Sequence, residues 1–284
     1  MTQLIRIAAV QLDVEFAHRK ANLARIESVL EETVAAGAAL TVFPECCVTG
    51  YCYESRDEAL AAAEEIPGST TKRLAALCRR LDTHMVVGLI EVEGHRLFNA
   101  CVLLGPEGVA GRYRKIHLPS LGVDRFVAPG DHPFAVHEAA GMRVGMNICY
   151  DGGFPESSRV LSLLGADLIV LPTNWPPGAE CMVQHAVNAR AMENHVYYLA
   201  ANRIGAERGF RFIGHSKICA PDGSVLAEAA HQDPAILYAD VDVELARDKR
   251  LVRVPNQHEI DRFADRRPEM YGPIVSPTAE PENL

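Results

Sequence analysis

Short apolar runs alternate along this chain with longer segments in which apolar residues recur at helical spacing. The runs predict buried β-strands, and the spaced segments predict amphipathic helices. Strands that alternate with helices indicate an α/β fold, in which helices stack on a sheet. In chain order, the pattern predicts strands at 5–12, 40–43, 85–91, 98–104, 143–149, 168–171, 197–202, 216–219, 224–227 and 236–242, and helices at 22–36, 70–81, 155–164 and 183–194.

Two segments of the chain resemble each other almost position for position. The segment 37–44 is GAALTVFP, and the segment 165–172 is GADLIVLP. Each follows a predicted helix, contains an apolar run and reaches a proline, which a central strand does not tolerate well. A further apolar run precedes each of them, at 5–12 and at 143–149. We interpret this as two similar halves packed against each other, with coincidence between two ordinary helix–turn–strand units as the alternative.

The residues that follow these apolar runs are candidates for a ligand site. Ligands of α/β sheets gather at the carboxyl ends of the strands. Glu45 follows the first copy of the repeat, Cys149 ends the strand before the second copy, and 173–175 (TNW) close the second copy. No low-complexity linker divides the chain. We therefore expect residues 1–267 to form a single domain, followed by an extended proline-containing tail at 268–284.

Composition and charge mainly exclude some classes of protein and some kinds of partner. The 284 residues are 48% hydrophobic and 23% charged, which is typical of a globular domain. A net charge of -9 disfavours nucleic acid or an anionic membrane as the main partner. No apolar run reaches the ~20 residues of a membrane helix. The short apolar start soon turns acidic at Asp13, unlike a signal peptide, so a cytoplasmic location is expected.

The cysteines and histidines show no metal-binding pattern. The eight cysteines contain no CxxC pair, and the eleven histidines contain no HExxH pair. Without a secretory signal, the cysteines are expected to be reduced thiols. The sequence therefore predicts no metal site.

Cys149 is the first candidate for chemistry. It ends a predicted strand and precedes 150–155 (YDGGFP), where a helix is expected to begin. A helix N-terminus favours the thiolate, and a thiolate can act as a nucleophile. The competing interpretation is a small buried hydrophobic residue, which most free cysteines are.

Glu45 and Lys115 are two further candidates. Glu45 follows a buried strand, where partial desolvation would raise its pKa and suit it to general-base catalysis. Lys115 lies in 113–119 (YRKIHLP), where basic residues adjoin apolar ones, so that its ammonium could enter a cleft and stabilise an oxyanion. Taken singly, a helix cap or ion pair explains Glu45 equally well, and a solvated strand edge explains Lys115.

Together these positions form an ordered set of motifs. FPE stands at 43–45, YRKIHLP at 113–119 and NICYDGGFPE at 147–156. This set resembles the motifs of the nitrilase superfamily of carbon–nitrogen hydrolases. The resemblance covers nearly the whole chain, from AAVQ at 8–11 to GHS at 214–216. Each motif is weak alone, but the ordered set is specific.

The resemblance implies a four-layer α-β-β-α sandwich, with two sheets face to face and helices outside. It also implies that Glu45, Lys115 and Cys149 form a Glu-Lys-Cys triad that acts through a thioester. In that mechanism Lys115 and the backbone N–H of Tyr150 hold the oxyanion, and Glu45 transfers protons. No cofactor is implied. The expected partners are a small-molecule amide or ureido substrate and a second copy of the chain, in a homodimer or a larger homo-oligomer.

The chain departs from the family pattern in the loop after the lysine. Many members carry a further glutamate there, whereas this chain has Asp124, whose side chain is one methylene shorter. We expect Asp124 to take that place in the substrate site. Tyr51, Asn174 and Trp175 are expected to line the same pocket, although Trp175, the single tryptophan, could equally cap the core.

The residues after the nucleophile bear on the substrate. Nitrilases of this family tend to have Cys-Trp-Glu, so the sequence CYD at 149–151 favours an amide over a nitrile. Gly153 stands where enzymes of dicarboxylate monoamides often carry arginine, which weakens an omega-amidase assignment. We therefore expect a thiol amidohydrolase that releases ammonia from a small aliphatic carboxamide.

Three alternatives remain open at the level of sequence. The chain could be an N-carbamoyl amidohydrolase, which uses the same triad on a ureido acid or amine. It could also be a nitrilase or a catalytically inactive scaffold. Arg125, Arg203 and His117 could each bind a substrate carboxylate, and each could equally be an ordinary surface charge.

Overall fold

The computed structural model describes residues 4–276 of the chain. They divide into two compact units, one up to Arg247 and one from Asp248 onward, which are described separately below. The predicted boundary at residue 267 lies within the second unit, and the domain limits stay a prediction.

The first unit contains two six-stranded mixed sheets. In each sheet three adjacent strands run parallel to one another, and antiparallel strands lie on both sides of these three. In spatial order, the first sheet consists of β14 (Ala235–Val241), β1 (Ile5–Gln11), β2 (Leu40–Val42), β3 (His84–Glu93), β4 (Arg96–Gly105) and β5 (Gly108–Arg114). The second sheet consists of β13 (Val225–Glu228), β12 (Lys217–Cys219), β9 (Tyr197–Asn202), β8 (Leu168–Thr173), β7 (Met142–Met146) and β6 (Val136–Ala139).

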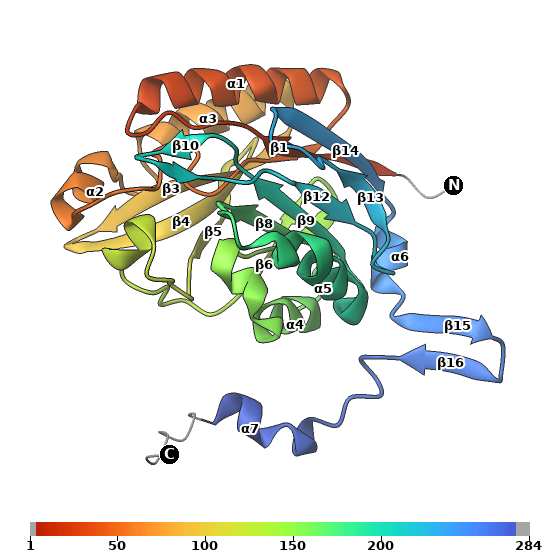
Figure 1. Cartoon of the computed structure of the whole chain (residues 1–284). Coiled ribbons are helices and arrows are strands. Elements are labelled where there is room, and N and C mark those ends of the chain that lie inside the picture. The colour runs from red at the N-terminus through yellow and green to blue at the C-terminus, as the bar shows by residue number, and fades with distance from the viewer. Residues whose placement is uncertain (1–3, 277–284) are drawn as a thin grey trace, which may run out of the picture. The chain divides into compact units, whose positions relative to one another are not determined.

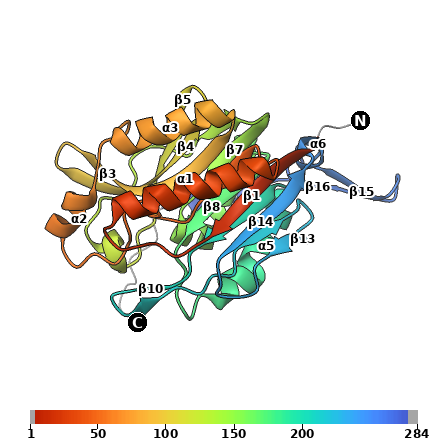
Figure 2. The same ribbon diagram turned by 90° about the horizontal axis from the view of Figure 1, so that it is seen from above.

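The sheets pack face to face, and helices cover both outer faces (Figure 1). On β3, Val86 joins the core cluster that contains residues of the second sheet, whereas its neighbour Met85 packs with the helices outside. This alternation is expected for a strand that is buried on both faces. The helices α1 (Arg19–Ala35) and α3 (Ser69–Leu81) lie on the first sheet (Figure 2), and α4 (Pro155–Leu163) and α5 (Val187–Asn194) lie on the second. The predicted four-layer sandwich is confirmed.

The repeat seen in the sequence is present in the backbone. In each of the units β1–α1–β2 and β7–α4–β8, a helix connects two parallel strands that pair directly with each other. Ala39 N–H donates to the carbonyl of Arg6, and Asp167 N–H donates to the carbonyl of Arg143, both at 2.8 Å. Each helix is followed by a glycine in the left-handed region, with φ of 89° at Gly37 and 92° at Gly165. The two halves are therefore built alike.

Most predicted elements agree with the structure to within a few residues, with two exceptions. The strand expected to reach Cys149 ends at Met146, because Cys149 has φ 46° and begins the short 3-10 helix η2 (Cys149–Gly153). The helix expected from residue 183 begins as a π-helical turn, η3 (Met182–Ala186), before α5. The sequence pattern missed β5 and β6, and also α2 (Arg56–Ala62), η1 (Gly122–Arg125), β10 (Ala206–Glu207), β11 (Phe210–Arg211) and α6 (Val243–Arg247).

The second unit is small. It contains the hairpin of β15 (Arg250–Val254) and β16 (His258–Asp261), followed by the short helical turns η4 (Pro268–Met270) and α7 (Gly272–Val275). An extended tail was expected at 268–284, but its described part consists mostly of these turns. Residues 277–284 lie outside the described residues.

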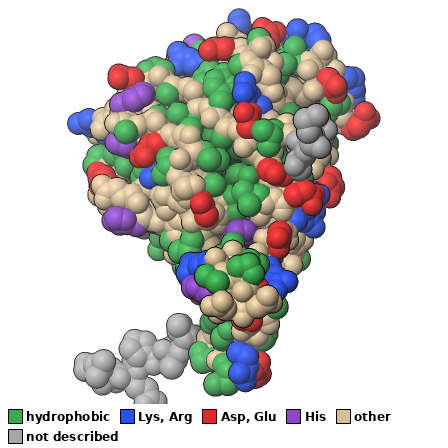
Figure 3. All heavy atoms as spheres, turned by 90° about the vertical axis from the view of Figure 1, so that its right-hand side faces the viewer, with side chains coloured by type: hydrophobic (Ala, Val, Ile, Leu, Met, Phe, Trp, Pro, Cys, Tyr) green, Lys and Arg blue, Asp and Glu red, His purple; other side chains and the backbone are tan. Residues whose placement is uncertain are grey.

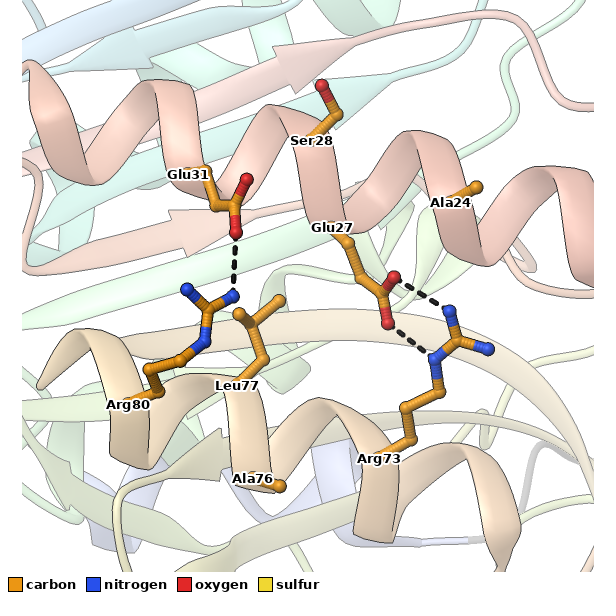
Figure 4. Close-up of a pocket in the computed structure, with 8 residues that line it drawn as sticks. All are labelled: Ala24, Glu27, Ser28, Glu31, Arg73, Ala76, Leu77 and Arg80. Carbon is orange, nitrogen blue, oxygen red and sulfur yellow. Dashed lines mark hydrogen bonds and ion pairs between the residues drawn. The ribbon is translucent and has the colours of Figure 1, made fainter.

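Two surface features lie away from the parallel strand ends. A groove of about 530 Å³ runs between α1 and α3, where Arg73 and Arg80 pair with Glu27 and Glu31 (Figure 4). The face that includes β13 and α6 exposes apolar side chains between charged ones (Figure 3), and Val225 and Leu245 are among the exposed residues of these elements. Within residues 4–276, no helix combines the length and the apolar character that crossing a membrane requires.

Candidate active site

Glu45 is separated from the end of β2 at Val42 by Phe43 and Pro44. Its side chain is fully buried. Oε1 accepts hydrogen bonds from Lys115 Nζ at 2.8 Å and from Asn99 Nδ2 at 2.7 Å. Oε2 is also buried, but it has no hydrogen-bond partner. One oxygen of this carboxylate is therefore held by the protein, and the other is available to a reacting group.

Lys115 follows β5 on the same sheet, and its ammonium is fully buried between two carboxylates. Nζ lies 2.6 Å from Asp124 Oδ2 in addition to the contact with Glu45. Burial alone lowers the pKa of Lys115, but the charges of Asp124 and Glu45 outweigh it and raise that pKa well above its ordinary value. Lys115 is therefore a permanent cation at physiological pH.

The pKa of Glu45 is also raised. Burial is the largest cause, Lys115 opposes it, and the charge of Asp124 adds to it. A carboxyl group whose pKa is moved toward neutrality can both give and take a proton, as a general acid–base residue must.

Asp124 lies in η1, and both of its oxygens bond to protein groups. Oδ2 accepts from Lys115 and from the Tyr51 hydroxyl at 2.7 Å, and Oδ1 accepts from Asn99 Nδ2 at 2.8 Å. Asp124 and Tyr51 were both expected to touch substrate. In the structure Asp124 holds Lys115, and the Tyr51 hydroxyl donates to Asp124 and to the carbonyl of Leu121, while contact of either residue with a substrate stays a prediction.

Cys149 comes from the second sheet. It is the first residue of η2 and is buried, with a left-handed backbone that turns the chain sharply after β7. The charges of Glu45 and Lys115 both influence its pKa, which indicates that the nucleophile candidate lies close to the ion pair. A non-glycine residue in this conformation carries strain of about 1 kcal/mol or more, as is common at functional sites.

The expectation that a helix dipole would favour the Cys149 thiolate is not met. Burial and the charge of Glu45 raise the pKa of Cys149 to about 12, and Lys115, the Thr173 hydroxyl and the Asn174 N–H oppose this only in part. A helix of five residues has a weak dipole. Cys149 is therefore a thiol in this structure, and it needs a base to become a nucleophile.

Asp151 joins the cysteine turn to the segment that carries the lysine. Its fully buried carboxylate accepts from Tyr113 Oη at 2.8 Å, from His117 N–H at 3.0 Å and from Ile148 N–H at 3.0 Å. The His117 ring nitrogen Nδ1 lies 2.7 Å away. These bonds connect the two sheets close to the site, so Asp151 fixes Cys149 relative to Lys115.

The remaining predicted site residues lie around Cys149. Tyr150 follows it in the first turn of η2, with its side chain half exposed. The Asn174 side chain is buried, and neither its Oδ1 nor its Nδ2 has a partner. Such a group is costly to bury unless a ligand completes its hydrogen bonds. Trp175 packs within the core cluster, in agreement with the core-capping alternative.

The three side chains considered for binding a substrate carboxylate are engaged elsewhere. Arg203 is buried against Glu207 and Asp13. Arg125 donates to the carbonyls of Tyr53 and Gly122, and His117 is bonded to Asp151.

Sequence reasoning missed Asn99, and it noted Asp151 only as a sign of the substrate class. A signal for Asn99 was present, because it is a polar residue within the apolar run predicted as the strand 98–104. A buried polar residue in such a strand indicates a partner that the strand itself does not supply. For metals, no group of three or more His, Cys, Asp or Glu side chains suited to an ion exists in the described part of the chain.

Comparison with known proteins assigns the family. The family model of carbon–nitrogen hydrolases matches residues 6–251, so the chain belongs to that family, within the nitrilase superfamily. It is 38% identical over 269 residues to a nitrilase from Pyrococcus abyssi, a match that covers 94% of this chain and 99% of the relative. It is 30% identical over 282 residues to an omega-amidase from Homo sapiens, covering 94% and 96%.

The solved structures agree. The chain superimposes with a TM-score of 0.78 and 25% identity on an amidase from Nesterenkonia sp., covering 94% of this chain and 95% of that one. That structure shows the acetamide moiety of fluoroacetamide covalently added at the active-site cysteine of the amidase. This chain is accordingly a hydrolase of carbon–nitrogen bonds other than peptide bonds.

Proposed function

We propose that this protein is a thiol amidase that hydrolyses a small, uncharged carboxamide to a carboxylic acid and ammonia. The observation that carries the proposal is the buried Glu45–Lys115 pair beside Cys149, in which Glu45 Oε2 alone lacks a partner. A base, a fixed cation and a nucleophile in one desolvated site suit acyl transfer to a thiol.

The first half of the reaction forms a thioester. Glu45 Oε2 takes the Cys149 proton as the sulfur bonds to the amide carbon, and the carbonyl electron pair moves to oxygen. Lys115 and the Tyr150 N–H stabilise that oxyanion. The carbonyl re-forms, the C–N bond breaks, and Glu45 gives its proton to the nitrogen, which leaves as ammonia.

The second half restores the enzyme. Water attacks the thioester carbon while Glu45 takes one of its protons, and the C–S bond then breaks. The sulfur regains the proton as Cys149 thiol, and the acid leaves. Asn174 is the proposed ligand of the substrate amide, because its buried carbonyl and amino groups match the donor and acceptor of a carboxamide.

An uncharged substrate is proposed because Arg203, Arg125 and His117 already bond to protein groups. An omega-amide or a ureido acid carries a carboxylate that needs a cationic partner. The N-carbamoyl and nitrile alternatives use the same three residues, so only a comparison of substrates can distinguish them from the amidase.

The experiment is ammonia release from propionamide, succinamic acid, 3-ureidopropionate and propionitrile, with wild type, Cys149→Ala and the control Cys219→Ala. Cys219 is another buried cysteine, located in β12. We expect turnover of propionamide by wild type and Cys219→Ala but not by Cys149→Ala. Turnover restricted to the ureido compound or the nitrile would contradict the amide assignment, and a folded wild type without any turnover would favour the inactive scaffold.

Two further proposals follow from the sequence. The homodimer or larger homo-oligomer, which the family resemblance implies, is to be measured by sedimentation. The cytoplasmic location, which was inferred from the N-terminal segment and not from the family, is to be measured by fractionation of the source cells.

A further inference from the structure

Asn99 lies in the middle of β4, opposite Ile90 of β3, with apolar neighbours on both sides. It is 1% exposed. A buried amide must find partners or destabilise the fold, so its contacts indicate why the strand carries it.

The Asn99 amino group donates to two carboxylates. Nδ2 lies 2.7 Å from Glu45 Oε1 and 2.8 Å from Asp124 Oδ1. The amide carbonyl faces the Cys46 thiol at 3.5 Å, and the backbone carbonyl accepts from Lys115 N–H at 2.8 Å. Asn99 therefore connects Glu45, Asp124 and the backbone of Lys115, while making no contact with Cys149 that would give it a direct chemical role.

Building on the proposed function, we propose that Asn99 is a positioning residue that makes Glu45 Oε2 the proton-transferring oxygen. Asn99 and Lys115 together occupy Oε1, whereas Oε2 is buried without a partner. A carboxylate with two fixed donors on one oxygen presents its other oxygen to the reacting atoms in a single orientation. Asn99 also holds Glu45 and Asp124 at a fixed separation across Lys115.

The charges around Glu45 set the expected sign of a pH effect. The titratable groups that act on it or feel its charge are Lys115, Asp124, Cys149, Tyr51, Cys46 and Cys101. Lys115 and the Asn99 amide lower the pKa of Glu45, whereas burial and Asp124 raise it. Loss of the Asn99 donor should raise the pKa of Glu45 further.

The test is the pH dependence of kcat/KM for Asn99→Leu, a substitution of similar size without a donor. Because Glu45 must be ionised to take the Cys149 proton, kcat/KM falls as pH drops through its pKa. We expect this acid limb to move up by about one pH unit, and kcat at its optimum to fall about tenfold to a hundredfold with KM little changed.

The matched control is Asn22→Leu. Asn22 is also a buried amide, and its side chain donates to the carbonyls of Glu15 and Val48 and does not contact Glu45. For Asn22→Leu, the acid limb of kcat/KM should lie at the same pH as in the wild type. If both variants lose activity with unshifted limbs, the role of Asn99 is only structural and the proposal is overturned.

A second variant, Asn99→Ser, tests the proposal in case Asn99→Leu does not fold. Asn99→Ser keeps a donor but is too short to bridge both carboxylates, so a smaller upward shift is expected. Its readout is the pH dependence of Cys149 alkylation by iodoacetamide, which needs no turnover. An unshifted profile overturns the positioning role while leaving the amidase proposal intact, whereas amide turnover by Cys149→Ala would overturn the amidase proposal itself.

Discussion

The repeated units β1–α1–β2 and β7–α4–β8 have the same backbone arrangement, but their candidate catalytic residues follow different strands of the unit. In β1–α1–β2 the candidate base follows the second strand, as Glu45. In β7–α4–β8 the candidate nucleophile follows the first strand, as Cys149. Counted from the matching residues Arg6 and Arg143, Leu12 stands where the other half has Cys149.

The converse also holds, because Thr173 follows Pro172 as Glu45 follows Pro44. Neither half carries both groups, and each supplies what the other lacks. The fold thus supplies equivalent positions at the strand ends of both units. Which residue type occupies each position decides whether it can take part in catalysis.

Substitution at the matching strand ends should give the largest difference between the halves. Glu45→Gln keeps the shape of the side chain but cannot transfer protons, so kcat/KM for amide hydrolysis should fall about 10²- to 10⁴-fold. Thr173→Val removes a buried hydroxyl that opposes the rise in the pKa of Cys149 but transfers no proton in the proposed mechanism, so a loss of about tenfold is expected. Ammonia release measures both, and equal losses would contradict different roles for the two strand ends.

The next effect concerns the attachment of the nucleophile turn. Asp151→Asn leaves one acceptor oxygen for donors from Tyr113, His117 and Ile148, and at least one buried donor loses its partner. The free energy of unfolding should fall by about 2–3 kcal/mol in urea titrations. The surface variant Asp222→Asn is the control, and equal stability of the two variants would argue against Asp151 as the connection between the sheets.

A pH effect should distinguish the halves at the start of their second strands. Asp167 of the second half is paired with Arg143 and Arg247, whereas the first half has Ala39 at that position. Burial raises the pKa of Asp167, but the two arginines outweigh it and lower that pKa below its ordinary value. The resulting stability is fully present above the unfolded pKa of about 4 and is lost as pH falls through the lower folded pKa.

Asp167→Asn should therefore lower the free energy of unfolding by about 1–2 kcal/mol at neutral pH, and the difference from wild type should shrink as pH falls below about 4. Urea unfolding at a series of pH values measures this. A constant difference at every pH would mean that packing, and not charge, accounts for the contribution of Asp167.

The smallest effect is expected on the helices that cover the first half. Arg73 and Arg80 of α3 pair with Glu27 and Glu31 of α1 at the surface (Figure 4). Exposed pairs of this kind contribute about 0.5 kcal/mol or less each, and salt screens them. Arg80→Ala should change the melting temperature by no more than about 2 °C and leave amide turnover unchanged. A clear loss of turnover would contradict this and indicate that the groove contributes to the active site.

The sequence by itself determined the strands and helices of the two repeated units, β1–α1–β2 and β7–α4–β8, and the strand ends at which chemistry was to be sought. Local signals are sufficient for this: apolar periodicity gives the elements, and Pro44 follows the end of β2, whereas β8 continues through Pro172 to Thr173. The ordered motifs around Glu45, Lys115 and Cys149 then pointed to the family.

Only the tertiary structure decided how these residues act. The Glu45–Asn99 hydrogen bond joins residues 54 positions apart, and no local pattern predicts it. Burial and the charge of Glu45 raise the pKa of Cys149, whereas the sequence showed only a nearby helix start that would favour the thiolate. Asp124 holds Lys115 and is itself held by the Tyr51 hydroxyl, contacts between distant segments that the sequence pattern did not predict. Burial and pairing depend on what the rest of the chain brings to a residue, so they exist only once both sheets have packed together.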